Sequence, residues 1–135
     1  MREIIGRTLS KGLASGRAIV TKQPISFLGD VDPESGCIKN KKHELFGVCL
    51  KERILCFPHG VGSTVGSYVL YGMKRIYDTA PSGLIFTKID PVIVVGAIIS
   101  NIPAVQVEAD DFKEIRDGEF IVINALKKRA VITIG

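Results

Sequence analysis

Short apolar runs dominate the chain, and most of them end at Gly, Pro or Asp. This pattern is typical of short strands. A less regular apolar stretch at residues 43–50 is also expected to be extended, and the tail is expected to form a hairpin that turns near Leu126 to Lys128. The predicted strands are residues 16–21, 53–58, 82–88 and 104–109, followed by the hairpin within residues 119–135.

Helical spacing follows the glycine-rich segment in the middle of the chain. Val65, Val69, Met73 and Ile76 recur on one face, with basic residues near the end, which predicts a helix over residues 64–77. The chain would form one β-rich α/β domain over residues 1–135, with two or three helices.

The apolar run after Asp90 fits either a strand or a helix by its pattern. Asp90 as N-cap and Pro91 at the first helical position favour a short buried helix. Residues 26–38 contain two glycines and an Asp-Pro pair, so they are expected to be a loop.

Composition limits the classes of partner. The net charge is only +4, the basic residues are scattered, and there is no Trp, which argues against nucleic-acid binding. Residues 91–105 are too short and too interrupted to span a bilayer, so no membrane partner is expected. A hydrophobic content of 46% suggests instead that a partner protein covers part of the surface.

The cysteines predict a reducing environment. Cys37, Cys49 and Cys56 are an odd number, and no secretory signal precedes them, which indicates free thiols and a cytoplasmic protein. Their spacing contains no CxxC pair, so no metal site built by this chain alone is expected. Cys49 and Cys56 are expected to be small core residues.

The stretch HGVGSTVGS holds the main candidate for chemistry. Gly62 and Ser63 would lie between a strand end and a helix start, where unpaired N–H groups and the helix dipole favour negative charge. Ser63 could therefore cap the helix, help to hold an anion, or act as a base. Ser67, one helical turn further on, could assist a phosphate site or simply pack. The spacing matches neither a Walker loop nor GxSxG, and whether His59 takes part stays open.

A second polar cluster lies in SFLGDVDPESG. Ser26, Asp30, Asp32 and Glu34 lie there around two glycines, the first of which is Gly29. The carboxylates resemble part of a calcium loop, but the glycine and distal Glu of an EF-hand are missing. Taken alone, the cluster is most simply explained by turn capping.

Four segments together resemble one family. PISFLGDVDPESGCI, HELFGVCLKERILCFPHGVGSTVGSYVLYGM, APSGLIF and GAIISNIPAV are similar to the small subunits of archaeal phosphomevalonate dehydratases, in the aconitase X group. The combination of Ser-Phe-x-Gly-x-Val-Asp-Pro with Gly-Ser-Thr-x-Gly-Ser is the specific part.

The resemblance implies a swivelling β/β/α domain like the one at the C-terminal end of aconitases. It implies a hydro-lyase that converts (R)-5-phosphomevalonate into trans-anhydromevalonate 5-phosphate, for isoprenoid synthesis, and that works only with a large subunit carrying a [4Fe-4S] cluster. Ser63 would be the proton acceptor.

The substrate pocket implied by the resemblance would be shaped by residues from both polar segments. Thr64 and Val65 stand where aconitases have Ser-Arg, so a carboxylate-binding arginine is missing. This favours a substrate with fewer carboxylates than citrate. The expected substrate-binding residues are Gly62, Thr64, Ser67, Ser26, Gly29 and Asp32.

Two alternatives remain at this stage. The chain could belong to another dehydratase of the same group, such as one acting on a hydroxyproline. It could also be a non-catalytic module that holds a phosphate on the Gly-Ser turn.

Overall fold

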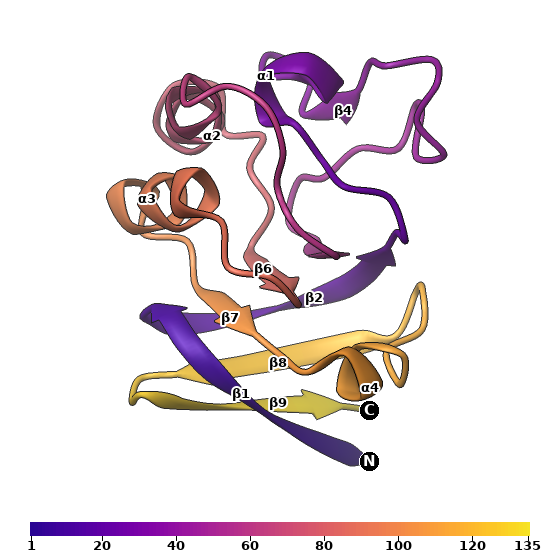
Figure 1. Cartoon of the computed structure of the whole chain (residues 1–135), viewed down its shortest axis with the longest axis vertical. Coiled ribbons are helices and arrows are strands. Elements are labelled where there is room, and N and C mark those ends of the chain that lie inside the picture. Colours follow the sequence, from indigo (N-terminus) through magenta and orange to yellow (C-terminus); the bar gives the residue numbers. More distant parts are fainter.

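A closed barrel with a layer of helices on one side makes up the chain, as Figure 1 shows for a computed structural model of residues 1–135. The barrel strands are β1 (Arg2–Ser10), β2 (Gly12–Val20), β5 (Ile54–Phe57), β6 (Gly83–Phe86), β7 (Ala104–Gln106), β8 (Phe120–Ala125) and β9 (Arg129–Ile134). A separate two-stranded sheet contains β3 (Val31–Asp32) and β4 (Cys37–Ile38). The helices are α1 (Phe27–Asp30), α2 (Gly66–Arg75), α3 (Pro91–Ser100) and α4 (Ala109–Phe112).

The barrel combines parallel and antiparallel pairing in the order β1-β7-β6-β5-β2-β8-β9. Strands β2, β5, β6 and β7 run parallel to their neighbours within this group, whereas β1 is antiparallel to both β7 and β9. The pairing of β1 with β9, in register from Arg2 opposite Ile134 to Arg7 opposite Arg129, closes the barrel. The first and last strands are therefore neighbours.

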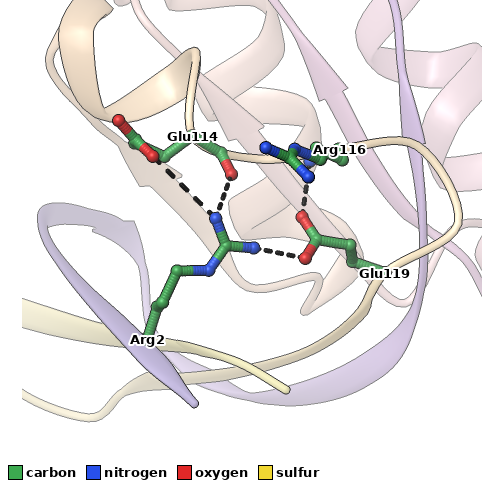
Figure 2. A network of polar contacts seen from close by, with 4 residues as sticks. All are labelled: Arg2, Glu114, Arg116 and Glu119. Atoms are coloured by element: carbon green, nitrogen blue, oxygen red, sulfur yellow. Dashed lines mark hydrogen bonds and ion pairs between the residues drawn. The ribbon is translucent and has the colours of Figure 1, made fainter.

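Polar contacts fasten the first strand to the loop before β8, as Figure 2 shows. Arg2 Nη1 donates to the Glu114 carbonyl at 2.9 Å, and Arg2 Nη2 pairs with the Glu119 carboxylate. The Arg116 N–H donates to Glu119 Oε1 at 2.7 Å. The Arg116 amide, assisted by the Arg2 guanidinium, holds the pKa of Glu119 below its usual value.

The chain has two apolar cores, one inside the barrel and one under the helices, and alternate side chains of the central strands belong to each. In β5, Ile54 and Cys56 point into the barrel, whereas Leu55 and Phe57 pack under the helices. In β6, Ile85 points inward and Leu84 and Phe86 outward, so both strands are buried on both faces. This double burial explains why β5 and β6 appear in the sequence as continuous apolar runs.

Most predicted elements are confirmed. Strands β5, β6 and β7, the β8–β9 hairpin, and helices α2 and α3 occupy the predicted regions. The observed elements differ from the predicted ones in four respects. The strand predicted at residues 16–21 begins at Gly12, β1 was not predicted, and α1, β3 and β4 lie in the expected loop. There are four helices rather than two or three, because α1 and α4 are single short turns.

The prediction that residues 43–50 are extended is wrong. Side-chain hydrogen bonds hold this segment in turns: His43 Nδ1 accepts from the Leu45 N–H at 3.0 Å, and Glu44 Oε1 accepts from the Lys22 N–H at 3.0 Å. Glu44 also accepts from the Thr21 hydroxyl, and these bonds lower the pKa of Glu44, the Thr21 bond most.

The expectation of free thiols is also wrong for two of the three cysteines. Cys37 and Cys49 form a disulfide, and Cys49 is exposed rather than part of the core. The two residues face each other across an isolated antiparallel bridge between β4 and the following loop, a proximity that their sequence spacing does not reveal. Cys56 is a buried free thiol inside the barrel, as predicted, and burial raises its pKa.

Candidate active site

The serine turn, residues 58–65, connects β5 to α2. Gly62 has φ +93°, a left-handed conformation that glycine adopts without strain. The chain then enters a tight turn in which the Gly66 N–H donates to the Ser63 carbonyl at 3.0 Å. Regular helix begins at Gly66, two residues after the predicted start, so Ser63 precedes α2 by one short turn.

Ser63 is partly exposed, and its hydroxyl has one partner in the chain. Ser63 Oγ accepts from the Val65 N–H at 3.1 Å. The N–H groups of Gly62, Ser63 and Thr64 donate to no group of the chain. Unpaired amides next to a helix N-terminus create a positive field that favours an anion or a deprotonated oxygen. The arrangement caps the turn and leaves donors free for a ligand.

The first half of the turn is clamped by the residue that leads into α1. The Ile25 N–H donates to the His59 carbonyl at 3.2 Å, and the Val61 N–H donates to the Ile25 carbonyl at 3.1 Å. On the other side, a Cβ at Gly60 would lie 2.4 Å from both Asp90 Oδ2 and Ile93 Cγ1. The turn therefore lies between α1 and the start of α3, and Gly60 is required by this close approach.

Ser26, one of the expected pocket residues, lies beside the turn, and Gly29, another of them, is hydrogen-bonded to Ser26. Ser26 caps α1 by accepting from the Gly29 N–H at 3.1 Å, and a Cβ at Gly62 would lie only 2.7 Å from Ser26 Oγ. The Ser26 N–H in turn donates to Asp30 Oδ2 at 2.8 Å. The structure thus places the second polar cluster against the Gly-Ser turn through its first residue, Ser26.

Asp32 is engaged within its own hairpin. Its carboxylate accepts from the Glu34 N–H at 3.3 Å and from the Ser35 hydroxyl at 2.9 Å. These bonds shape the turn between β3 and β4. No hydrogen bond joins Asp32 to the serine turn, so its expected part in the pocket stays a prediction.

Thr64 and Ser67 line a groove between α2 and α3. The groove has a volume of about 530 Å³. Thr64 is exposed at its mouth, whereas Ser67 is buried and donates to the Val92 carbonyl of α3 at 3.2 Å. The Ser67 hydroxyl therefore joins the two helices, which is the packing alternative considered for it.

His59 faces its own neighbour. Its Nδ1 lies 2.9 Å from the Gly60 carbonyl oxygen, and no hydrogen bond connects the ring to Ser63. The segment from Pro58 to Ser67 contains no Lys or Arg, and no ion pair reaches it. The turn itself thus supplies dipoles around Ser63 but no basic side chain.

The contact between Gly60 and Asp90 was not predicted from the sequence. Asp90 was expected only as the cap of α3, and it does accept from the Val92 N–H at 3.1 Å. Its second oxygen lies against the serine turn. The closely spaced glycines were the one sequence signal of such a close approach.

The residues present do not suit an iron–sulfur cluster. No group of three or more His, Cys, Asp or Glu side chains is arranged to hold a metal ion. Cys37 and Cys49 are bonded to each other, and Cys56 lies inside the barrel core.

None of the helices has the length and apolar character needed to cross a membrane.

Comparison with known proteins places this chain and its fold in a family. A family model described as the aconitase X swivel domain matches residues 3–134. The phosphomevalonate dehydratase small subunit of Methanosarcina mazei is 46% identical over 120 residues, covering 88% of this chain and 83% of the relative. The protein of the same name from Methanothrix thermoacetophila is 42% identical over 133 residues, covering 98% and 96%.

A solved structure agrees with the sequence comparisons. The crystal structure of Thermococcus kodakaraensis aconitase X in its holo-form superposes with a TM-score of 0.90 at 36% identity, covering 98% of this chain and 99% of that chain. The expected swivelling β/β/α fold is thereby confirmed. The chain belongs to the aconitase X family and forms its swivel domain.

Proposed function

We propose that this chain is the small subunit of a two-subunit hydro-lyase that dehydrates (R)-5-phosphomevalonate to trans-anhydromevalonate 5-phosphate. Relatives that are 42% and 46% identical over most of the chain bear the name phosphomevalonate dehydratase small subunit. The observation that carries the catalytic part is the turn at Ser63, whose hydroxyl lies next to three free N–H groups in front of α2.

Ser63 would take the proton from the carbon alpha to the substrate carboxylate. The tertiary hydroxyl leaves from the next carbon, the double bond forms between the two carbons, and the proton and hydroxide together account for the water released. A serine hydroxyl is a very weak acid, so it needs stabilisation of its alkoxide form. The free amides at Ser63 and Thr64 would provide part of that stabilisation.

The remaining stabilisation would come from the partner. The serine turn holds no basic side chain, and the apolar residues Val61 and Val65 flank Ser63 at 45% and 46% exposure. A cation next to Ser63 would therefore belong to the large subunit that the relatives' names imply. The [4Fe-4S] cluster would lie in that subunit as well, because the Cys37–Cys49 disulfide and the burial of Cys56 leave no cysteine of this chain available to ligate it.

The pocket beside Ser63 would be formed by Gly62, Thr64, Ser26 and Gly29. Two observations support this pocket: Gly62 lies close to Ser26, and Thr64 lines the groove between α2 and α3. Asp32 and Ser67 would contribute indirectly, since their polar atoms are engaged in the β3–β4 turn and the α2–α3 contact.

The test is turnover by the reconstituted complex. The chain would be co-purified anaerobically with its large subunit and assayed with (R)-5-phosphomevalonate and, separately, with hydroxyprolines. Ser63→Ala should reduce turnover about 1000-fold or more while substrate binding is kept. Ser15→Ala, at an exposed serine on β2, is the matched control and should leave turnover unchanged.

Each alternative has its own outcome in this assay. Turnover of a hydroxyproline but not of phosphomevalonate would indicate another dehydratase of the same family. Wild-type turnover by the Ser63→Ala complex would rule out the catalytic assignment. A complex that binds phosphate on this chain but dehydrates neither substrate would identify a binding module.

A further inference from the structure

The outer face of α3 has no polar residues. Between Pro91 and Ser100 the helix contains no charged side chain, and Ser100 is its only polar one. Ile93, Gly96, Ala97 and Ser100 point inward. The outward residues are instead Val95, Ile98 and Ile99, which are 49%, 52% and 39% exposed. A helix that is apolar on all sides is normally covered on all sides.

This face forms one wall of the groove between α2 and α3. The groove is lined by Thr64, Ser67, Tyr68, Pro91, Val92, Val95 and Ile99, none of which is charged. Tyr68, on the opposite wall, is 71% exposed, a large aromatic side chain with little to pack against in the isolated chain. Rigid aromatic and aliphatic side chains around a groove are typical of the centre of an interface.

The groove opens directly beside the serine turn. Thr64 belongs to both, and Val61 and Val65, two residues before and after Ser63 in the sequence, also have exposed side chains. Any protein that fills the groove therefore contacts Thr64, the residue next to the serine. The free N–H groups at this point carry a positive field and have no partner in the chain.

We propose that the groove between α2 and α3 is the docking surface for an apolar segment of the large subunit, which thereby closes the site over Ser63. This inference rests on the proposed function. The relatives are named small subunits, which implies a large subunit as the partner. A second copy of this chain is the poorer occupant, because its own groove is uncharged and its serine turn would bring no Lys or Arg. The large subunit would contribute apolar side chains to the groove and a basic group at its rim.

The experiment compares two exposed valines. Val95→Glu places a charge in the groove, and Val122→Glu places the same charge on β8, where Val122 is 41% exposed on the barrel. The affinity of each purified variant for the large subunit would be measured by titration without substrate, and its fold by circular dichroism. Val95→Glu should weaken binding about 30-fold or more, and Val122→Glu should leave it unchanged.

A second variant keeps the test decisive if Val95→Glu fails to fold. Tyr68→Ala removes an exposed side chain from the opposite wall and should weaken binding about 10-fold. Wild-type affinity of folded Val95→Glu, or of Tyr68→Ala where Val95→Glu does not fold, would overturn the proposal. The proposal would also be overturned if Val122→Glu weakened binding as much as Val95→Glu does. It would likewise be overturned if the chain alone associated with itself and Val95→Glu abolished that association.

Failure of the docking proposal can be told apart from failure of the proposed function. A complex that dehydrates phosphomevalonate but is insensitive to the groove variants contradicts only the docking. A complex whose assembly depends on the groove but which does not dehydrate phosphomevalonate contradicts only the function.

Discussion

Helices α2 and α3 are both ten residues long and pack against each other, but their outer faces differ. Away from the groove, the outer face of α2 carries Tyr71 and ends in the basic residues Lys74 and Arg75, as expected for a surface helix. The outer face of α3 is entirely apolar. One helix has the composition of a surface helix, and its neighbour does not.

The N-termini of the two helices also differ, and here α3 is the conventional helix and α2 the unusual one. Helix α3 begins with a side-chain cap from Asp90 and a proline at its first position, a complete local start. Helix α2 has no side-chain cap at its first residue and is preceded by the serine turn with its free N–H groups. The difference suggests a division of roles, in which the start of α2 serves chemistry and the face of α3 serves assembly.

The strongest test of this division measures both kcat and the affinity for the large subunit in a variant of each helix. Ser63→Ala should lower kcat about 1000-fold or more without changing the affinity for the large subunit. Val95→Glu should weaken that affinity but recover most of kcat when the large subunit is raised above the new Kd. Both quantities are measured by titrating the large subunit into each variant at saturating substrate.

A mixed result would break the comparison. If Ser63→Ala also weakened assembly about 30-fold, the serine turn would be part of the binding energy rather than only of the chemistry. If kcat of Val95→Glu stayed low even at saturating large subunit, α3 would position reacting groups.

The next prediction concerns the contact through which α3 supports the turn. Gly60→Ala would place its Cβ 2.4 Å from Asp90 Oδ2 and Ile93 Cγ1, so the turn must move away from α3. A displacement of about 1 Å at a reacting group can cost about 100-fold in rate, so kcat should fall roughly 10- to 100-fold. Gly72→Ala, with its nearest neighbour 4.0 Å away, is the control and should keep kcat. Unchanged kcat in Gly60→Ala would show that the turn adjusts freely.

The sequence predicts the two helices well because their signals are local. The periodic Val65, Val69 and Met73, and the Asp90-Pro91 start, lie within or next to the helices themselves. Barrel closure could not be predicted in the same way, since β1 pairs with β9 from the other end of the chain. Pairing between distant segments depends on tertiary packing rather than on local preference.

The site shows the same limit. The glycines around Ser63 are a local signal that predicts a special turn, and the closeness of Ser26 to that turn follows from the family resemblance. The approach of Asp90 to Gly60 joins two loops that are distant in the sequence, and neither residue type predicts the other. The exposed face of α3 was missed for a different reason: an apolar helix in one chain predicts burial without saying which protein provides it.

A smaller effect is expected where the two helices touch. A Cβ at Gly96 would lie 3.2 Å from Ser67 Cα and 3.3 Å from Leu70 Cδ2, so Gly96→Ala should push α2 and α3 apart. The free energy of unfolding should fall by about 1–2 kcal/mol, because the crowding exceeds the gain in helix propensity. Gly72→Ala has room for its methyl group and should raise the same free energy by up to about 1 kcal/mol. Urea unfolding of both variants measures the two signs, and equal signs would mean that the helices separate without cost.

The smallest effect is expected at the start of α3. Asp90→Ala removes the acceptor for the Val92 N–H and should lower the free energy of unfolding by about 1 kcal/mol, whereas Asp90→Asn keeps a capping oxygen and should change it little. Ser63→Ala removes a bond to the Val65 N–H from a partly exposed turn, and water can replace that bond, so its stability cost should be smaller than that of Asp90→Ala. Urea unfolding of the three variants measures the order. If Ser63→Ala were the most destabilising, Ser63 would be first of all a structural cap, and the division of roles between the two helices would lose its basis.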